Sequence, residues 1–424
     1  MSQTIPRILR DQAQLLKRRT AEKYPDLAPL AEQCFLNTIE TTVTTLEDGS
    51  SFVITGDIPA MWLRDSAAQL KPYIQFANED AELKAILRSV VQKHAFYINH
   101  DPYANAFNAL PEQFHQSDET DFKSGWVWER KYEVDSLCAA LYLSHEYYSV
   151  TKDDSIFTED FRLMLTKIVG TFSIEQRHNE LSSYFFTRQN CARTDTLPNH
   201  GWGHVVNYTG MTWSGFRPSD DACTFGYLIP ANMMAVVALR YGAELARAGF
   251  DDESLASACL LLAEEIDDGI RTYGIVNHPK YGRIYAYETD GYGNYVLMDD
   301  ANSPSLLSIP YLGYVGADDP VYQNTRRFIL SPDNPYYFSG QYAKGIGSPH
   351  TPDRYIWHIA LTMQILTSTD PAEVNECLGM LAATHAGTNY MHEGFCVDDP
   401  TQYTRPWFAW ANTLFAQMLG EVTK

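Results

Sequence analysis

The stretch LIPANMMAVVAL (228–239) is apolar on nearly every face when it is drawn as a helix. A helix that touches water carries its apolar side chains on one stripe, so an apolar surface all round indicates burial on every side. Directly upstream stands GFRPSDDA (215–222), which is rich in charged and hydroxyl side chains. We therefore look along the chain for further buried helices that begin after a polar cluster.

Buried helices of this kind recur along the chain. Further examples are LCAALYLS (137–144), YIWHIALTMQIL (355–366) and WFAWANTLFAQML (407–419). Between them lie segments whose apolar residues repeat every 3.6 positions, the pattern of a half-buried helix. These are 27–41, 78–99, 157–172, 255–270 and the helices expected to begin at Asp319-Pro320 and Asp370-Pro371. Asn78 is a candidate cap, and Glu373 could complete a capping box with Asp370.

The two kinds of helix alternate six times, and the short gaps between partners predict antiparallel neighbours. An all-α fold is expected: an (α/α)6 barrel with six inner and six outer helices, in a single domain spanning residues 1–424. Minor β-hairpins are expected in long loops, at 50–58, 183–189 and 273–289.

A polar cluster precedes each buried helix. The six clusters are MWLRD (61–65), GWVWERKYEVD (125–135), GFRPSDDA (215–222), MDDANSPS (298–305), HTPDRYIW (350–357) and YTRPW (403–407). In such a barrel all inner helices begin at the same end, so the six clusters should share one mouth. The helix N-termini add backbone N–H groups and positive dipole ends there.

Charge and composition limit the class of protein. The net charge of −21 disfavours nucleic acid and anionic membrane surfaces as partners. We find no apolar run long enough for a transmembrane helix and no signal peptide, and the seven cysteines are dispersed without a CxxC pair. These features favour a cytoplasmic protein with reduced thiols over a periplasmic or secreted one. The oligomeric state is left open.

Several kinds of chemistry lack their motifs. The chain has no P-loop, no GxGxxG after a strand, no GxSxG elbow, no HExxH and no DDxxD. His385, His392 and Glu393 lie in THAGTNYMHEGF (384–395), where the glycines indicate a loop. Loop histidines are more often hydrogen-bonding groups than metal ligands, so we expect no metal and no cofactor.

Carboxylates are abundant at the expected mouth: Asp65, Glu129, Asp220, Asp221, Asp299, Asp300, Asp353 and Glu393. Taken singly, each is better explained structurally. Asp65 could pair with Arg64, and Asp220 or Asp221 could cap a helix begun by Pro218-Ser219. Taken together with the aromatic residues, 13% of the chain, they favour glycoside cleavage. That reaction needs one protonated and one ionised carboxyl. Asp221 could stay ionised and discourage Asp220 from ionising, although either could be the acid.

Five motifs carry a resemblance to a known family. They are GDIPAMWLRDSAAQLKPYI (56–74), KYEVDSLCAALYL (131–143), FRPSDDACTFGYLIPANMMAV (216–236), MDDANSPSLLSIPYL (298–312) and THAGTNYMHEGF (384–395). The chain resembles glycoside hydrolase family 125, the metal-independent exo-α-1,6-mannosidases of bacteria and fungi. The resemblance implies an (α/α)6 barrel and an inverting mechanism on short mannose-containing oligosaccharides such as N-glycan fragments. It also implies Asp220 as general acid and Glu393 as general base.

Sugar contacts are expected from the other mouth residues. Arg64 and Asp65 are the leading candidates, because an Arg donor and an Asp acceptor make charge-assisted bonds with hydroxyls. The further candidates are Glu129, Asp300, Asn302 and Arg354 for binding, and Trp126, Trp128 or Tyr355 for stacking. Two alternatives stay open: a phosphorylase or lyase on the same barrel, and a noncatalytic oligosaccharide-binding protein.

Overall fold

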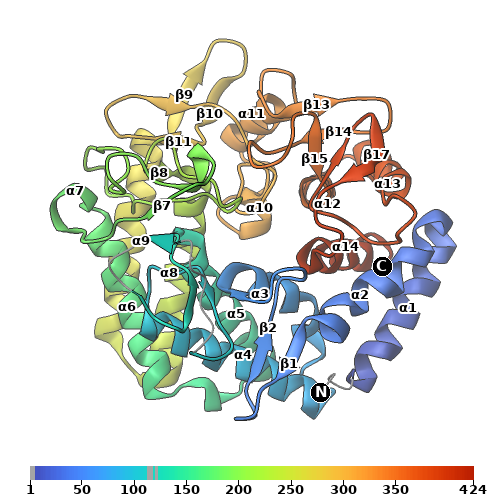
Figure 1. The fold of residues 1–424 in the computed structure, drawn as a ribbon, viewed down its shortest axis with the longest axis horizontal. Helices are drawn as coiled ribbons and strands as arrows, with labels where there is room; N and C mark the ends of the chain where they lie inside the picture. Colours follow the sequence, from blue (N-terminus) through green and yellow to red (C-terminus); the bar gives the residue numbers. More distant parts are fainter. Residues whose placement is uncertain (1–4, 112–117, 120–122) are drawn as a thin grey trace.

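The structure, a computed structural model, describes residues 5–111, 118–119 and 123–424 and is mainly helical (Figure 1). The described residues form 14 α-helices, joined by loops that carry short strands. The helices are α1 (Arg7–Lys23), α2 (Ala28–Thr41), α3 (Leu63–Leu70), α4 (Ala81–His100), α5 (Val134–Thr151), α6 (Glu159–Glu175), α7 (His178–Leu181), α8 (Ile229–Phe250), α9 (Glu253–Tyr273), α10 (Ile309–Leu312), α11 (Pro320–Ile329), α12 (His358–Leu366), α13 (Pro371–Ala383) and α14 (Ala409–Val422).

Helices α8 and α9 show the predicted difference between buried and half-buried partners. In α8, 15 of 22 residues are buried, whereas α9 buries only 8 of 21, including Cys259, Leu262 and Ile266 on one stripe. The two helices pack against each other. On its other side α8 contacts α5, α5 contacts α3, α3 contacts α14, and α14 contacts α12. The prediction of buried helices backed by half-buried ones is confirmed here.

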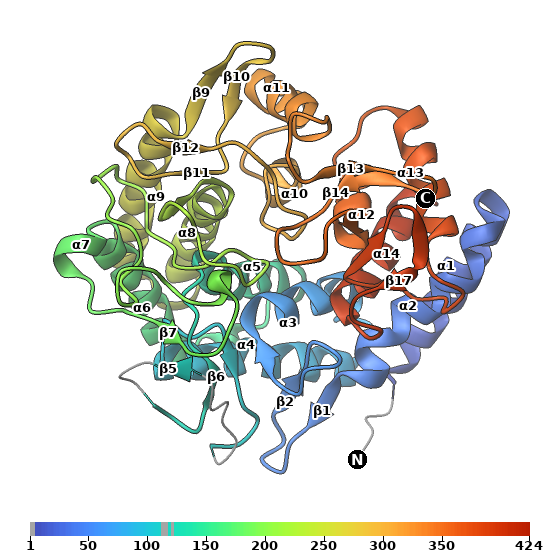
Figure 2. The ribbon, with the colours of Figure 1, turned by 45° about the horizontal axis from the view of Figure 1, so that its top comes forward.

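Short antiparallel sheets lead into three of the buried helices, α3, α8 and α12, which are labelled in Figure 2. Strands β3 (Met61–Trp62), β8 (Tyr227–Leu228) and β15 (Tyr355–Trp357) each end at the residue before α3, α8 and α12 begin. Their partners include β4 (Ala106–Phe107), β11 (Glu288–Thr289) and β16 (Gly394–Cys396). Backbone pairing therefore fixes where these helices start, and with them the polar residues at their first turns.

The remaining strands lie in the loops, as expected for minor β structure. Hairpins form between β1 (Val43–Thr45) and β2 (Ser51–Val53), between β9 (Ile275–His278) and β10 (Gly282–Tyr285), and between β13 (Tyr337–Ser339) and β14 (Lys344–Ile346). Strand β5 (Asp118–Glu119) pairs with β7 (Thr187–Arg188). The other three are β6 (Val127–Glu129), β12 (Tyr295–Val296) and β17 (Asp399–Tyr403).

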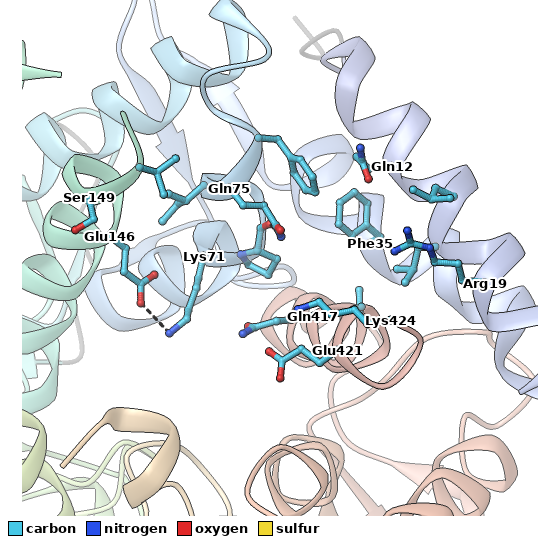
Figure 3. A pocket seen from close by; sticks show the side chains of 18 of the residues that line it. Gln12, Arg19, Phe35, Lys71, Gln75, Glu146, Ser149, Gln417, Glu421 and Lys424 are labelled. Carbon is cyan, nitrogen blue, oxygen red and sulfur yellow. Dashed lines mark hydrogen bonds and ion pairs between the residues drawn. The ribbon is translucent and has the colours of Figure 1, made fainter. Parts of the chain in front are cut away.

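A cleft opens at the C-terminal ends of α3, α5 and α14, where α1 also contributes (Figure 3). Its empty volume, counted out to open solvent, is about 1400 Å³. Lys71, just past α3, is paired there with Glu146 of α5 at 2.9 Å. This cleft lies at the opposite end of these helices from the polar clusters that precede them.

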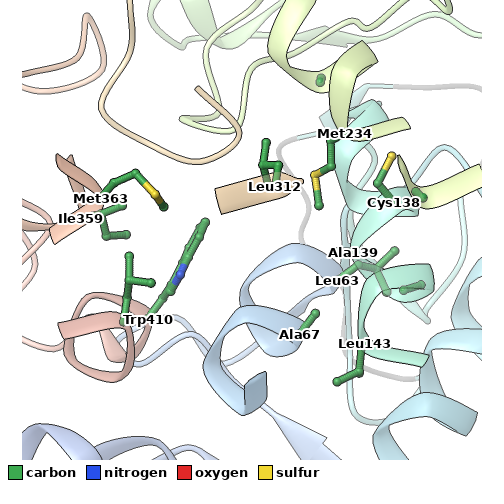
Figure 4. Close-up of a cluster of buried hydrophobic side chains, with 14 of the residues drawn as sticks. Leu63, Ala67, Cys138, Ala139, Leu143, Met234, Leu312, Ile359, Met363 and Trp410 are labelled. Carbon is green, nitrogen blue, oxygen red and sulfur yellow. The ribbon is translucent and has the colours of Figure 1, made fainter. Parts of the chain in front are cut away.

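The hydrophobic core lies where six helices meet (Figure 4). The side chains that meet there include one or more from each of α3, α5, α8, α10, α12 and α14, among them Leu63, Leu143, Met234, Leu312, Met363 and Trp410. Burying a side chain of this size stabilises the fold by about 1.5–3 kcal/mol. The core therefore ties together segments that are far apart in the chain, from Leu63 to Trp410.

Helix α10 is much shorter than the buried helix expected after MDDANSPS (298–305). It spans four residues and ends at Gly313, whose φ of +84° is a left-handed conformation that stops the helix. The buried helix expected here is therefore a single turn.

Two predicted caps also differ from the structure. Asp80, not Asn78, caps α4 by accepting the N–H groups of Glu82 and Leu83, while the Asn78 amide donates to the Val150 carbonyl. Asp370 caps α13 as expected. Glu373, however, binds Ser368, Gln364 and Arg326, so the described contacts do not include a capping box with Asp370.

Two further properties concern membranes and thiols. No helix in the described part of the chain combines the length and the apolar character needed to cross a bilayer. The seven cysteines are all unpaired, and five of them are buried, as the dispersed pattern predicted.

Candidate active site

A polar pocket lies beside the N-terminal end of α3. Its empty volume is about 340 Å³, and five of the six predicted polar clusters contribute to its lining. The lining residues are Thr55, Ile58, Trp62, Arg64, Asp65, Pro218, Ser219, Asp220, Asn302, His350, Trp357, Glu393, Arg405 and Phe408. The sixth cluster, 125–135, contacts this lining through Lys131 and Glu133. The predicted convergence of the clusters on one site is thus confirmed.

Asp220 sits in a turn that holds its carboxyl group in the pocket. Its φ is +72°, a left-handed conformation that Asp adopts more readily than most residues. In this turn the Arg217 N–H donates to the Asp221 carbonyl and the Asp220 N–H donates to the Arg217 carbonyl. Lys131 Nζ donates to the Asp220 carbonyl at 2.9 Å. Asp220 Oδ1 is buried and has no hydrogen-bond partner in the described structure. Within that structure no helix begins at Pro218-Ser219, so Asp220 is not a helix cap.

Glu393 enters the pocket from the loop before β16 and is almost fully buried. Arg405 Nη1 lies 3.6 Å from Glu393 Oε1. The same guanidinium is held by Asp57, with Nε–Oδ1 at 2.9 Å, and by Thr55 Oγ1 at 3.1 Å. Glu393 is thereby placed beside a cation that is itself fixed by two groups.

Arg64 lies at the buried end of the pocket among three carboxyl groups. Its Nη1 donates to Glu133 at 2.6 Å and to Asp135 at 3.0 Å, and Nη2 lies 3.5 Å from Asp65. Burial raises the pKa of Asp65, Glu133 and Asp135, and the charge of Arg64 opposes that rise. One oxygen of each of the three carboxyl groups lacks a hydrogen-bond partner in the described structure. Of the three, Asp65 lines the pocket, so its carboxyl group is placed to accept from a hydroxyl group there.

His350 also lines the pocket and pairs with Asp221, at 3.1 Å between Nδ1 and Oδ1. Burial alone would lower the pKa of His350, but the bond to Asp221 and the charges of Asp220 and Glu393 raise it to about 9. The expected repulsion between Asp221 and Asp220 is consequently offset by a cation beside Asp221.

Two of the other predicted binding residues lie next to the pocket without lining it. Asp300 is buried and accepts a hydrogen bond from Ser219 Oγ at 2.6 Å. Glu129 accepts from Arg188 at 2.8 Å and from Asn105 at 2.9 Å. Although burial acts to raise the pKa of Glu129, the cations Lys131 and Arg188 lower it to about 2. Both carboxylates thus support side chains that belong to or touch the lining.

Asn302 and Arg354 have different positions. Asn302 lines the pocket and its amide donates to the Pro218 carbonyl at 2.8 Å, which braces the turn that carries Asp220. Arg354 is exposed and pairs with Asp398 at 2.5 Å, outside the pocket lining.

None of the three aromatic residues expected to stack on sugar lines the pocket. Trp62, Trp357 and Phe408 line it. Trp126 instead packs edge-on against Phe96, with ring centroids 5.0 Å apart, and Trp128 packs against the cluster that contains Trp62. Tyr355 lies on β15 outside the lining.

Comparison with known proteins identifies the family. Residues 24–420 match the family described as metal-independent alpha-mannosidases, GH125. The chain belongs to this family. It is therefore a glycoside hydrolase, an α-mannosidase of GH125, and the polar pocket is its candidate active site.

Individual relatives agree with this assignment. A solved Streptococcus pneumoniae structure, described as a metal-independent alpha mannosidase in a non-productive substrate complex with alpha-1,6-mannobiose, is 47% identical, with a TM-score of 0.96. That match covers 100% of this chain and 99% of the other. The meiotically up-regulated gene 157 protein of Schizosaccharomyces pombe is 42% identical over 417 residues, which cover 93% of this chain and 82% of that protein. Hormoconis resinae glucoamylase shares the fold alone, at 12% identity and a TM-score of 0.52 over 96% of this chain and 73% of its own.

This α-mannosidase belongs to a family described as metal-independent, so its possible metal ligands are of interest. Across the residues that the structure describes, no three His, Cys, Asp or Glu side chains gather as a metal site would require. His392 instead stacks on Tyr403, at 3.8 Å between ring centroids, and His358 Nδ1 bonds to the His392 backbone. Asp299 accepts the N–H groups of Leu306 and Leu307 and so acts in folding its loop.

Sequence patterns missed some of the residues that shape this site. His350 and Arg405 stand inside clusters that were recognised, yet neither was singled out. Glu133 and Lys131 were quoted only as parts of a motif. The available signal was a cation in five of the six clusters, and this signal becomes specific only when the carboxylate partners are known.

Proposed function

We propose that this GH125 α-mannosidase is an exo-acting enzyme that releases terminal mannose from α-1,6-linked mannosides, such as N-glycan fragments. The observation that carries the proposal is the placement of Asp220 and Glu393 in one small polar pocket. The likeness to the Streptococcus pneumoniae protein, whose complex contains alpha-1,6-mannobiose, supports the choice of linkage. The pocket's limited size and buried floor suit the end of a chain better than its middle.

Asp220 is the proposed general acid and Glu393 the proposed general base of an inverting hydrolysis. Asp220 gives its proton to the glycosidic oxygen as the bond from that oxygen to the anomeric carbon breaks. Glu393 takes a proton from a water whose oxygen attacks the anomeric carbon from the opposite face. Enzymes of this type hold their two carboxyl groups about 6.5–9.5 Å apart to leave room for the water. Arg405, whose Nη1 lies 3.6 Å from Glu393 Oε1, is placed to hold this carboxyl group in position.

The terminal mannose is proposed to contact Arg64, Asp65 and Asn302 at the floor of the pocket. Arg64 and Asp65 are 4% exposed, and Asp65 keeps a free buried oxygen to accept from a hydroxyl. Glu129 and Asp300 are proposed to act through their neighbours: Glu129 holds Lys131, which binds the Asp220 carbonyl, and Asp300 holds Ser219. We do not extend the proposal to Arg354.

The chain as a whole is proposed to form one catalytic domain with an (α/α)6 barrel. The alternation of six buried helices with six half-buried ones supports this topology, with α10 as a shortened inner member. Residues 24–420 match a single family along their whole length. The seven unpaired cysteines support a reducing, cytoplasmic location.

Mannose release from α-1,2-, α-1,3- and α-1,6-mannobiose, with and without phosphate, tests the proposed function. Hydrolysis of the α-1,6 isomer without phosphate is expected; a requirement for phosphate would support the phosphorylase alternative. Asp220→Asn and Glu393→Gln should each lower kcat by about 10²–10⁴-fold while substrate still binds. Asn suits the left-handed backbone of Asp220. A matched control is Asp251→Asn, since Asp251 is exposed at the far end of α8 and also has a positive φ, +47°.

Activity that survives both substitutions would overturn the acid and base roles. Binding of mannosides without any cleavage by wild type would support the oligosaccharide-binding alternative instead.

A further inference from the structure

His350 stands at the rim of the active-site pocket. It is among the more exposed residues of the lining, and 34% of its side chain remains accessible. Arg64 and Asp65, by contrast, are 4% exposed at the floor. A terminal sugar that reaches the floor would leave the next sugar of the chain at the level of His350.

The His350 ring is held in a fixed orientation. Its Nδ1 faces Asp221 Oδ1 at 3.1 Å, and Asp221 is 3% exposed. The His350 backbone N–H donates to Ser348 Oγ at 3.2 Å, which fixes the turn that carries the ring. Nδ1 therefore donates to Asp221, and Nε2, across the ring, has no protein partner in the described structure and remains available to a ligand.

The charges that raise the pKa of His350 are all negative. Asp221 and Glu393 favour its protonated form, as does Asp220 whenever it is ionised, whereas burial disfavours it. The balance raises the pKa of His350 to about 9, so the ring is an imidazolium at neutral pH. An imidazolium N–H is a stronger hydrogen-bond donor to a sugar oxygen than a neutral group.

We propose that His350 binds the leaving-group sugar, the residue next to the terminal mannose, through a hydrogen bond from Nε2, with Asp221 as its positioning residue. This inference rests on the proposed function, because it takes the direction of the substrate from an exo-acting enzyme with Asp220 at the scissile bond. It makes His350 a determinant of specificity for the second sugar rather than for the terminal mannose.

Comparing two substrates separates this role from others. α-1,6-Mannobiose contains the second sugar, whereas an aryl α-mannoside keeps the terminal mannose and replaces that sugar. For His350→Ala we expect kcat/KM on mannobiose to fall by about 10- to 100-fold, the value of one charge-assisted hydrogen bond. On the aryl mannoside it should change by less than about threefold. The matched control is His145→Ala, because His145 also pairs with a carboxylate, Glu244 at 2.8 Å, but lines the far-end cleft.

Other results of that comparison would overturn the proposal. An equal loss on both substrates would place His350 at the terminal mannose or the acid, and no loss on either would give it no role in binding. Should His350→Ala fail to fold, as judged by its thermal unfolding midpoint, His350→Gln is measured in the same way, with a smaller loss confined to mannobiose expected. A wild type that cleaves neither substrate would refute the proposed function itself.

The pH dependence provides a second readout that a purely structural role would not move. The ratio of wild-type to His350→Ala activity on mannobiose is taken from pH 6 to pH 10, and each pH profile is also fitted separately because removing His350 changes the charge beside Asp220 and Glu393. The ratio should fall towards one as pH rises through about 9, where His350 loses its proton. A ratio that stays constant over this range would contradict the proposed charged contact.

Discussion

Arg405 Nη1 lies 3.6 Å from Glu393 Oε1, while Nε of the same guanidinium donates to Asp57 at 2.9 Å. Arg405 thus links Glu393, the proposed base, to Asp57, which is 348 residues from Arg405 in the chain. A planar guanidinium can engage several acceptors in fixed directions, which an ammonium group cannot do.

Arg405→Lys should therefore keep the positive charge but lose the geometry that holds Glu393. We expect kcat on α-1,6-mannobiose to fall at least about tenfold with little change in the thermal unfolding midpoint, because Arg405 remains partly exposed. Steady-state kinetics check this, with Arg162→Lys, in the surface pair with Asp252, as the control. Unchanged kinetics in Arg405→Lys would show that Glu393 needs no such support.

Substituting Arg64 should lower the stability of the fold, because Arg64 is buried among Glu133, Asp135 and Asp65. Arg64→Met removes the cation and leaves three buried carboxyl groups without it. Breaking a buried ion pair in this way costs about 3–5 kcal/mol. Urea unfolding should show that loss, together with loss of activity. A variant of normal stability would mean that the carboxyl groups are already neutral without Arg64.

The Glu129 carboxylate makes stability depend on pH. Its pKa in the folded protein is about 2, below its ordinary value of 4.5, so its contribution to stability is fully present above about pH 5. The contribution is lost as pH falls from 4.5 towards 2, because protons then bind the unfolded chain preferentially.

Glu129→Gln lacks this dependence. The free energy of unfolding of wild type, relative to Glu129→Gln, should fall by about 1.4 kcal/mol between about pH 6.5 and pH 3.5. Urea titrations at both pH values measure it, and Glu253→Gln, at an exposed pair with Arg247, should show a much smaller change. A difference that grows at low pH would reverse the assigned sign.

Metal removal should leave activity intact. The family is described as metal-independent, and the described residues hold no cluster of metal-ligating side chains. Dialysis against EDTA, followed by assay of mannose release, is expected to give the untreated rate. Activity that is abolished by EDTA and restored by calcium would contradict the acid and base mechanism with protein groups alone.

Much of the fold could be predicted because a buried helix can be recognised from the apolar pattern of its own residues. The stretch 228–239, apolar on nearly every face, indicates a buried helix, and the residues before it must then lie at the start of that helix. The strands β3, β8 and β15, which fix three of these entrances, were not foreseen, since two- and three-residue strands carry too little periodicity. The length of α10 was not predicted, although Gly313, which ends it in a left-handed conformation, is a residue that commonly ends helices.

Residues of the candidate site could likewise be predicted only where a local sequence motif contains them. Arg64, Asp65, Asp220, Asn302 and Glu393 could be named because they stand in short motifs, and they share one pocket. Glu129 and Asp300 do not line that pocket. They bind Arg188 and Ser219, which come from other segments of the chain. Pairings over such separations depend on the complete tertiary structure, so His350 and Arg405 could not be selected from sequence alone.

The most direct test of the proposed mechanism is time-resolved proton NMR of the wild-type protein with α-1,6-mannobiose, recorded before mutarotation mixes the anomers. We predict that β-mannose appears first, as required when Glu393 directs water to the face opposite the leaving sugar. Initial α-mannose would show a retaining mechanism and contradict the role of Glu393.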